Sequence, residues 1–335
     1  MPDQSEPKRL PWNTGKHTIG LIDANGFVDP VKMNGGEAWN PNNIAGRVTE
    51  EIYRKIHELI TKGVSFENTT LSTAYFARKY KGVGLDLELA SFSILGNEQG
   101  HPQQKDSLAI ALHEGIPAQD ITKYGLVTIV ADGSGINGEY LSKYVADTIL
   151  SEFYKRVKMI APSSEQYTDT SLYRLFEGIE QSVFSALNKQ LQAGDNRYLN
   201  ALTTYTATLT FQQKGERKLI VFNRGDSPAI MFEGMSGNPR LRKRYYKIQA
   251  ISEKFIQNLQ KVTDSAPTNV GIVTGFISAR KLGDKMFCSG MQSVPANSIL
   301  IQGSDSLVDK FKEEELQSIV SGCNPESLLN KIKGR

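Results

Sequence analysis

Several residue types that mark whole classes of protein are scarce in this sequence. Only two of its 335 residues are cysteine, Cys288 and Cys323, so a framework of disulfide bonds is excluded and a reducing, cytoplasmic environment is expected. Its four histidines are too few for a metal site rich in imidazole ligands. No apolar run approaches the roughly 18 residues that a membrane-spanning helix needs, so we expect no membrane partner.

An excess of charge of one sign is also missing. The formal net charge is +3, which is too small to indicate a nucleic-acid partner. The first residues, MPDQSEPKRLPWN, are polar and interrupted by proline, unlike a secretory signal. A chain of 335 residues can bury one large core, so we expect a soluble globular protein, whose oligomeric state the sequence does not indicate.

Two regions of the chain differ in composition. Residues 1–84 begin with proline, glycine and asparagine clusters and then show one helical pattern, with apolar residues at Ile44, Val48, Ile52, Ile56 and Ile60. We interpret this region as an N-terminal extension, a loop-rich arm plus a helix, packed on the main body. Residues 85–335 contain successive strand and helix patterns and are expected to form the main domain.

Hydrophobic periodicity predicts the elements of the main domain. Strands are expected over residues 89–95, 106–112, 127–131, 203–212, 218–223, 229–233 and 298–302. Helices are expected over residues 140–158, 168–192, 312–321 and 325–333, the second of them capped by Asp169 or Thr170. Strands, a pair of long helices and then further strands favour an α+β fold in which sheets pack together beneath helices.

The stretch VTIVADGSGINGEY, from Val127 to Tyr140, contains the main chemical motif. Its β-branched run predicts a buried strand that stops at Asp132, before Gly133 and a helix that starts near Gly138. A carboxylate at a strand end, beside glycines that allow close approach of another group, suits a hard cation or a phosphate. A plain strand-to-helix turn is the alternative.

Two more aspartates occur in a similar context. Asp106 begins a predicted strand, while Asp132 and Asp305 each end one. If these strand ends meet at one edge of packed sheets, the three carboxylates come together and repel one another unless cations neutralise them. Oxygen ligands without histidine or cysteine select magnesium, manganese or calcium. Three unrelated turn aspartates are the alternative.

Several short segments follow one another between about Leu89 and Arg335. They are ASFSILGNEQGHPQQKDSLAIA, VADGSGINGE, TYTATLTF, LIVFNRGDSPAIMF, ISARKLGD and ILIQGSDSLVD. In this order they resemble the metal-dependent protein phosphatase 2C family, and more closely its bacterial branch. The first is similar to the segment that ends in the family's first metal-binding aspartate, and the others are similar to VADGMGGxxxGE, GTTAT, NVGDSRxY, TRALGD and LLCSDGLWD.

The resemblance implies a four-layer αββα sandwich of two mainly antiparallel sheets flanked by helices, with two Mg²⁺ or Mn²⁺ ions at one end. By position, Asp106 and Asp132 would be metal ligands, with Asp132 as the bridge. Gly133 would offer its backbone carbonyl, and Asp305 would hold the second metal. The implied activity is attack of a metal-bridged hydroxide on phosphoserine or phosphothreonine of a phosphorylated protein substrate, without a covalent phosphoenzyme.

Other motif residues are expected to have different roles. The loop of the second hairpin is expected to be structural, shaped by Asn223, Gly225, Asp226 and Ser227. Asp284, in the LGD segment, either supports a third metal or a lid, or is a turn residue. The basic cluster from Arg240 to Arg244 either attracts phosphorylated partners or forms a solvated hairpin face.

The sequence departs from the family pattern at several positions. His101 stands where members carry the arginine that holds the substrate phosphate, and an imidazolium lacks the bidentate fork of arginine. Lys105 replaces an acidic residue, Ser134 replaces histidine or methionine, and Ser306 replaces a glycine. The sequence ends at Arg335, about where the family's closing Asp-Asn pair and last strand would start, so either the chain is truncated or the protein lacks both that ligand and that strand.

These features lead to three hypotheses. The first is a Mg²⁺- or Mn²⁺-dependent serine/threonine phosphoprotein phosphatase with Asp106, Asp132 and Asp305 at the metals and His101 at the phosphate. The second is an inactive pseudophosphatase of the same fold that binds a partner without turnover. The third is a phosphatase or sensor of small molecules. Titration with metal distinguishes the first two, because an inactive binder is expected to bind metal weakly.

Overall fold

The structure is a computed structural model that describes residues 21–22, 28–29, 48, 51–52, 55, 76–82, 85–91, 105–111, 114, 116–233, 240–244, 276–283, 285–295, 298–305, 307 and 311–323. His101, Asp284, Ser306 and the helix expected over residues 325–333 lie outside this part. In the expected N-terminal helix, the described residues Val48, Glu51, Ile52 and Lys55 are helical. None of the helices within the described ranges is long and apolar enough to cross a bilayer.

The central sheet has six strands, paired antiparallel in the order β11–β8–β7–β6–β5, with β12 also paired to β8. The strands are β5 (Ser107–Ile110), β6 (Leu126–Gly135), β7 (Ala201–Gln213), β8 (Glu216–Arg224), β11 (Phe287–Cys288) and β12 (Gln292–Ser293). Threonines alternate with apolar residues along β7, so its two faces differ in polarity. This alternation determines which side of the sheet is polar.

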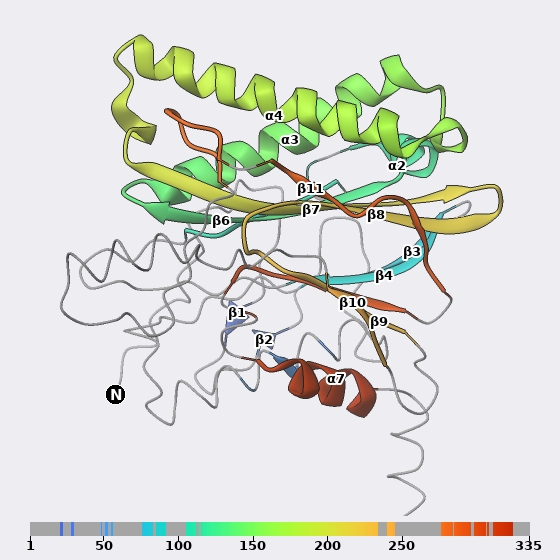
Figure 1. The fold of residues 1–335 in the computed structure, drawn as a ribbon. Helices are drawn as coiled ribbons and strands as arrows, with labels where there is room; N and C mark the ends of the chain where they lie inside the picture. The colour runs from blue at the N-terminus through green and yellow to red at the C-terminus, as the bar shows by residue number, and fades with distance from the viewer. Residues whose placement is uncertain are drawn as a thin grey trace, which may run out of the picture.

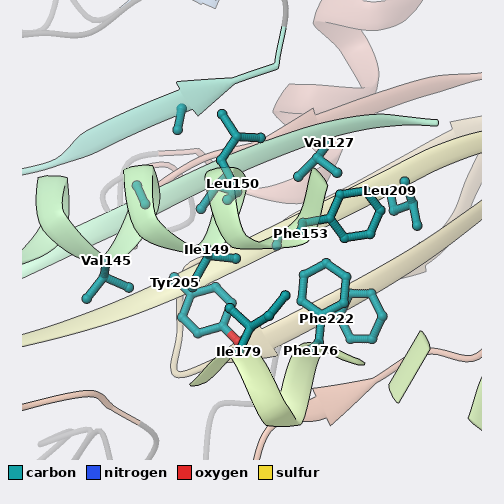
Figure 2. Close-up of a cluster of buried hydrophobic side chains, with 14 of the residues drawn as sticks. Val127, Val145, Ile149, Leu150, Phe153, Phe176, Ile179, Tyr205, Leu209 and Phe222 are labelled. Carbon is teal, nitrogen blue, oxygen red and sulfur yellow. The ribbon is translucent and has the colours of Figure 1, made fainter. Parts of the chain in front are cut away.

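Two long helices, α3 (Gly138–Ile160) and α4 (Asp169–Gln192), cover one face of the central sheet (Figure 1). Their apolar side chains pack against β6, β7 and β8, and Figure 2 shows Phe153, Phe176 and Phe222 in this core. The rings of Phe176 and Phe222 stack with 3.7 Å between their centroids. The shorter helical segments are α2 (Ala118–Tyr124), η1 (Ser164–Gln166) and η2 (Asn196–Tyr198).

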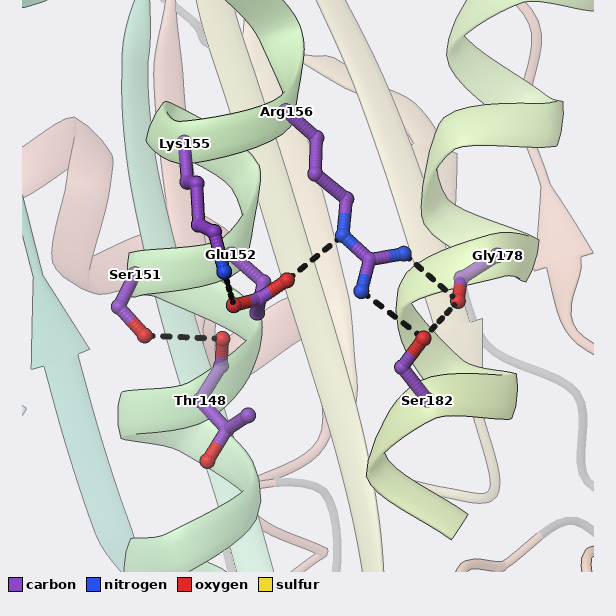
Figure 3. Close-up of polar contacts among 7 residues, drawn as sticks. All are labelled: Thr148, Ser151, Glu152, Lys155, Arg156, Gly178 and Ser182. Carbon is purple, nitrogen blue, oxygen red and sulfur yellow. Dashed lines mark hydrogen bonds and ion pairs between the residues drawn. The ribbon is translucent and has the colours of Figure 1, made fainter. Parts of the chain in front are cut away.

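Polar contacts also join the two long helices to each other. The Arg156 guanidinium on α3 donates to Glu152 on its own helix, with 2.6 Å between Nε and Oε2 (Figure 3). It also donates to the Gly178 carbonyl at 3.1 Å and to Ser182 Oγ at 2.9 Å, both on α4. The helix pair is therefore held together by directional bonds as well as by its apolar contacts.

A second, three-stranded sheet lies on the other side of the central sheet (Figure 1). Its order is β10–β9–β13, from β9 (Ala229–Glu233), β10 (Arg240–Arg244) and β13 (Ile299–Gln302). Helix α7 (Glu313–Gly322) lies below this sheet in the view of Figure 1. Two further antiparallel pairs are β1 (Leu21–Ile22) with β2 (Val28–Asp29), and β3 (Phe76–Gly82) with β4 (Leu85–Ser91).

Side-chain alternation shows which faces of the two sheets pack together. On β8, Ile220 and Phe222 join the core beneath α3 and α4, whereas Leu219 and Val221 pack with Ala229, Met231 and Leu300 of the second sheet. On β9, the intervening Ile230 and Phe232 instead join a third cluster with Leu316 and Val320 of α7 and with Val48 and Ile52. Each sheet therefore has an apolar cluster on both of its faces.

Three sequence-based expectations need correction. The strand expected to begin at residue 89 begins earlier, as β4 (Leu85–Ser91), while its expected residues 92–95 lie outside the described part; the short helix α2 was not expected. The cap of α4 is Thr168, whose side chain accepts from Ser171 N, and not Asp169 or Thr170. Strand β6 does not stop at Asp132 but continues to Gly135, because β7 pairs with it along its full length. The division into residues 1–84 and 85–335 stays a prediction.

A candidate carboxylate metal centre

Asp132 lies within β6, on the side of the central sheet that faces the second sheet. It stands opposite Thr204 of β7, and its backbone carbonyl accepts a hydrogen bond from Thr203 Oγ1 at 2.7 Å. Ile129 and Ala131 belong to the core beneath the helices, so Asp132 has the opposite orientation. Its backbone is thus held by β7, while its carboxylate is directed between the sheets.

The structure brings Asp106 and Asp305 to Asp132 from two different sheets. Asp106 directly precedes β5 of the central sheet, and Asp305 follows β13 of the second sheet. The Asp132 carboxylate lies within hydrogen-bonding range of both, and Asp106 also contacts the Ser304 side chain. Three aspartates that are far apart in the sequence therefore meet at one end of the two sheets.

Burial and mutual repulsion raise the pKa of two of these carboxyl groups. For Asp132, burial is the largest cause, and the charges of Asp106 and Asp305 add to it, which raises its pKa to about 10. Burial also raises the pKa of Asp106, although hydrogen bonds with Ser304 and Asp132 act in the opposite direction. The cluster is therefore one in which protons or cations must compensate the negative charge.

Glycines allow the N-terminus of α3 to pack directly on β6 beside Asp132. A Cβ atom on Gly133 would lie 2.3 Å from the Gly138 carbonyl oxygen and 2.6 Å from the Lys105 carbonyl oxygen. A Cβ atom on Gly138 would lie 2.8 Å from the carbonyl carbon of Gly133. Gly135 has φ +81, and a Cβ there would lie 2.2 Å from the Asn200 oxygen. The three glycines of the motif thus allow the backbones of β6 and α3 to pack closely beside Asp132.

Backbone and hydroxyl contacts hold the segment that carries Asp106. Gly133 N donates to the Lys105 carbonyl at 3.2 Å, and Ser142 Oγ on α3 donates to the same carbonyl. Ser142 is fully buried, and its Oγ is also 2.9 Å from Ser107 Oγ. No sequence motif singles out Ser142 or Ser304, although a serine within the apolar stripe of α3 is a visible exception to that stripe.

The hairpin after β8 packs on β7 next to Asp132. Asn223 Nδ2 donates to Thr206 Oγ1 at 2.6 Å and to the Ser227 carbonyl at 2.8 Å, and Thr206 Oγ1 donates to that carbonyl as well. Ser227 Oγ lies 2.9 Å from Thr204 Oγ1. Gly225 has φ +112, a conformation that glycine adopts without strain. Asn223 and Ser227 are thus structural residues in this loop.

The donor atoms at this site suit a hard divalent cation. In the described part of the chain, no group of three or more His, Cys, Asp or Glu side chains is arranged so that it could hold a metal ion. The three aspartates nevertheless contact one another through Asp132, and the Gly133 backbone lies beside them. Carboxylate and carbonyl oxygens are the ligands that Mg²⁺ and Mn²⁺ prefer, so the chemistry of the residues fits these ions.

Comparison with known proteins gives matches to solved structures. No protein-family model and no curated protein sequence matches this chain. The serine/threonine phosphatase Stp1 from Staphylococcus aureus matches with a TM-score of 0.46 and 15% identity, over 79% of this chain and 90% of that chain. The phosphatase PstP/Ppp from Mycobacterium tuberculosis matches with a TM-score of 0.42 and 15% identity, over 78% and 93% of the two chains.

A match outside bacteria is serine-threonine phosphatase 2C from Toxoplasma gondii, with a TM-score of 0.45 and 14% identity over 79% of this chain and 88% of that chain. The chain is thus similar along most of its length to serine/threonine phosphatases of the PPM family, several of them bacterial. Since these TM-scores lie below 0.5 and the identities are 14–15%, the likeness by itself assigns no function.

Proposed function

We propose that this chain is a Mg²⁺- or Mn²⁺-dependent serine/threonine phosphoprotein phosphatase. The observation that carries the proposal is the meeting of Asp106, Asp132 and Asp305 at one end of two sheets. Holding three carboxylates together, two of them desolvated, is costly unless they bind something positive, and they are oxygen ligands of the kind that hard cations take. The order of the sequence motifs supports a phosphatase over other metal-dependent activities.

The proposed fold is a four-layer αββα sandwich of two mainly antiparallel sheets. It is supported by three apolar clusters that are separated by the two sheets: one beneath α3 and α4, one between the sheets and one against α7. Figure 1 shows the elements in the same succession. In such a fold the metal centre lies where the two sheets meet at one end, which is where Asp132 and Asp305 contact each other.

In this proposal the carboxylates of Asp106, Asp132 and Asp305 and the Gly133 carbonyl would hold the two ions. When bound, the ions would activate a water molecule and neutralise the charge of a phosphoryl group. Neighbouring residues hold the Asp106 ligand in place. Ser142 and Gly133 bond to the backbone before Asp106, and Ser304 contacts the Asp106 carboxylate. Contact of His101 with the substrate phosphate stays a prediction.

A second candidate function is a pseudophosphatase that binds a phosphoprotein without turnover. Lys105 favours it, because it places a cationic side chain directly before Asp106, where the family has an acidic residue. A positive charge near the cluster competes with a cation for the same carboxylates. The two candidates therefore differ in how tightly the site binds Mn²⁺.

The test is Mn²⁺-dependent hydrolysis of p-nitrophenyl phosphate and of a phosphothreonine peptide by the full chain. Asp132→Asn is expected to lower turnover by at least about a hundredfold. Changing a residue that only supports a metal ligand typically costs about 10- to 100-fold, and changing a ligand should cost more. Asp147→Asn is the matched control, since Asp147 makes an exposed ion pair with Lys143 on α3. Its turnover should equal that of the wild type.

The possible results separate the candidates. Metal-dependent turnover that Asp132→Asn removes and Asp147→Asn keeps would support the phosphatase. A folded wild-type chain that shows no turnover at any Mn²⁺ concentration, and weak Mn²⁺ binding by calorimetry, would instead support the pseudophosphatase. Turnover that survives Asp132→Asn would contradict the proposed centre.

A further inference from the structure

A row of hydroxyl groups occupies the face of the central sheet that is directed toward the second sheet. It consists of Thr128 on β6 and of Thr204, Thr206 and Thr208 on β7, and we call it the threonine face. Thr206 and Thr208 are almost completely buried. Buried hydroxyls need hydrogen-bond partners, so this face requires polar groups from outside its own strands.

Gln302 supplies such a partner from the second sheet. Its Oε1 accepts from Thr128 Oγ1 at 2.8 Å, and Thr128 Oγ1 is in turn 2.6 Å from Thr208 Oγ1. Its Nε2 donates to the backbone carbonyl of Thr206. One amide side chain on β13 is therefore bonded to both β6 and β7 of the central sheet.

The position of Gln302 along the chain connects this contact to the carboxylates. Gln302 is the last residue of β13, and Gly303, Ser304 and Asp305 follow it directly. Gly303 N donates to the Pro228 carbonyl at 3.1 Å, so the turn starts from a fixed point. Thr128 lies four residues before Asp132 on β6. The amide thus joins the strand that leads to Asp305 with the strand that contains Asp132.

Metal ligands must be held at exact distances from one another, which requires a fixed register between the two sheets. Mg²⁺ requires near-ideal octahedral geometry with ligands at about 2.0–2.1 Å, and productive sites are held within roughly 0.5 Å. The other described contacts between the sheets near β13 include the apolar cluster of Leu219, Val221, Met231 and Leu300. Apolar contact is non-directional and permits small sliding movements, whereas an amide bonded at two points does not.

We propose that Gln302 is a positioning residue that sets the register between the two sheets and so places Asp305 against Asp132 for metal binding. This inference rests on the proposed metal-dependent function. Gln302 touches neither metal nor substrate; it acts through the three residues that follow it. An apolar residue at this position would fill the space but would leave the two sheets without this directional link.

The test uses the full chain with Gln302→Met, which keeps the length of the side chain and removes the amide. Mn²⁺ binding measured by calorimetry is expected to weaken about ten- to a hundredfold, as for other residues that support ligands. In metal-free protein, hydrogen exchange of the Gly303 and Leu307 amides, which bond to Pro228 and Ser304, is expected to accelerate on the order of tenfold.

Tyr205→Phe is the matched control on the opposite face of β7. It removes a fully buried hydroxyl that donates to Glu180 Oε1 at 2.5 Å, so it also deletes one hydrogen-bonding group from this strand. Stability measured by urea unfolding should fall for Tyr205→Phe, while its Mn²⁺ affinity and its exchange at Gly303 should equal those of the wild type. A merely structural role of Gln302 would make the two variants behave alike.

Three results are informative. Weakened Mn²⁺ binding and faster exchange in Gln302→Met, but not in Tyr205→Phe, would support the inference. Wild-type affinity and exchange in folded Gln302→Met would overturn it and leave the proposed function intact. If the wild type itself binds no Mn²⁺, the proposed function fails, and the positioning of a metal ligand by Gln302 fails with it.

Discussion

The two faces of the central sheet carry different kinds of side chain although they are formed by the same strands. The face beneath α3 and α4 is made of large apolar side chains such as Phe222, Leu209 and Val127 (Figure 2). The opposite face carries Asp132 and the threonine face on β6 and β7, beside the apolar Leu219 and Val221 on β8. Because apolar burial stabilises without fixing exact positions, whereas hydrogen bonds are directional, we infer that the first face provides stability and the second provides geometry.

The apolar face also contains a network of charged side chains, which lies on the side of the sheet away from Asp132. Arg224 on β8 makes a bidentate ion pair with Glu180 on α4, with Nε–Oε1 and Nη2–Oε2 distances of 2.7 Å. Both side chains are nearly completely buried, and Tyr205 donates to the same carboxylate. Arg224 Nη1 donates to the Gly283 carbonyl at 3.0 Å, which also ties the segment 276–283 to the sheet.

The largest effect is expected from breaking that ion pair. Arg224→Met leaves the Glu180 carboxylate buried without its guanidinium and should lower the free energy of unfolding by about 3–5 kcal/mol. The Mn²⁺ affinity of the folded variant should not change, since the pair lies on the face away from Asp132. Urea unfolding and calorimetry measure the two quantities.

The double variant Arg224→Met with Glu180→Leu is the control for this prediction. It removes both charges, so it should recover most of the lost stability, while Tyr205 keeps its contact with Met286 Sδ at 3.2 Å. A single variant as stable as the wild type would show that the pair contributes little. A large loss of Mn²⁺ affinity would show that the two faces are not independent.

A smaller effect on stability is expected from Thr206→Val, on the threonine face. The change removes the hydroxyl that accepts from Asn223 and donates to Ser227, which should cost about 1–3 kcal/mol. Unlike Arg224→Met, it should also weaken Mn²⁺ binding, because Ser227 contacts Thr204, the residue opposite Asp132.

Thr210→Val is the matched control for Thr206→Val. It is the same chemical change on the same strand, four residues farther from Asp132 and on the same side of β7. Calorimetry should find its Mn²⁺ affinity equal to that of the wild type. Equal losses of affinity in both variants would mean that the effect is not local to the carboxylates.

The smallest effect is expected at the cap of α4, in the layer that covers the apolar face. Thr168 Oγ1 accepts from Ser171 N at 3.1 Å, and Thr168 N donates to Ser171 Oγ at 3.0 Å. Thr168→Ala should therefore lower stability by about 1 kcal/mol without any change in Mn²⁺ affinity. Thr168→Ser is the control and should stay near the wild type; a metal-binding defect in Thr168→Ala would contradict the separation of roles.

Much of the architecture follows from local pattern. The periodicity of Leu141, Val145, Ile149 and Phe153 predicts α3, and the alternation over residues 203–212 predicts β7. The end of β6 was predicted wrongly because the glycines after Asp132 indicate a turn. In the structure the strand is extended to Gly135 by pairing with Ala201 of β7, a partner that no local pattern specifies.

In the candidate site, too, some residues were predictable from the sequence and others were not. The sequence was sufficient to single out Asp106, Asp132 and Asp305 as carboxylates of one chemical kind, and to predict oxygen ligands in place of a histidine-rich site, because residue type and composition are local properties. It could not identify Ser142, Ser304, Gln302 or the Arg224–Glu180 pair. Their contacts depend on how two sheets and two helices pack, since hydrogen bonds and ion pairs between distant residues form only in the register that burial of the apolar faces allows.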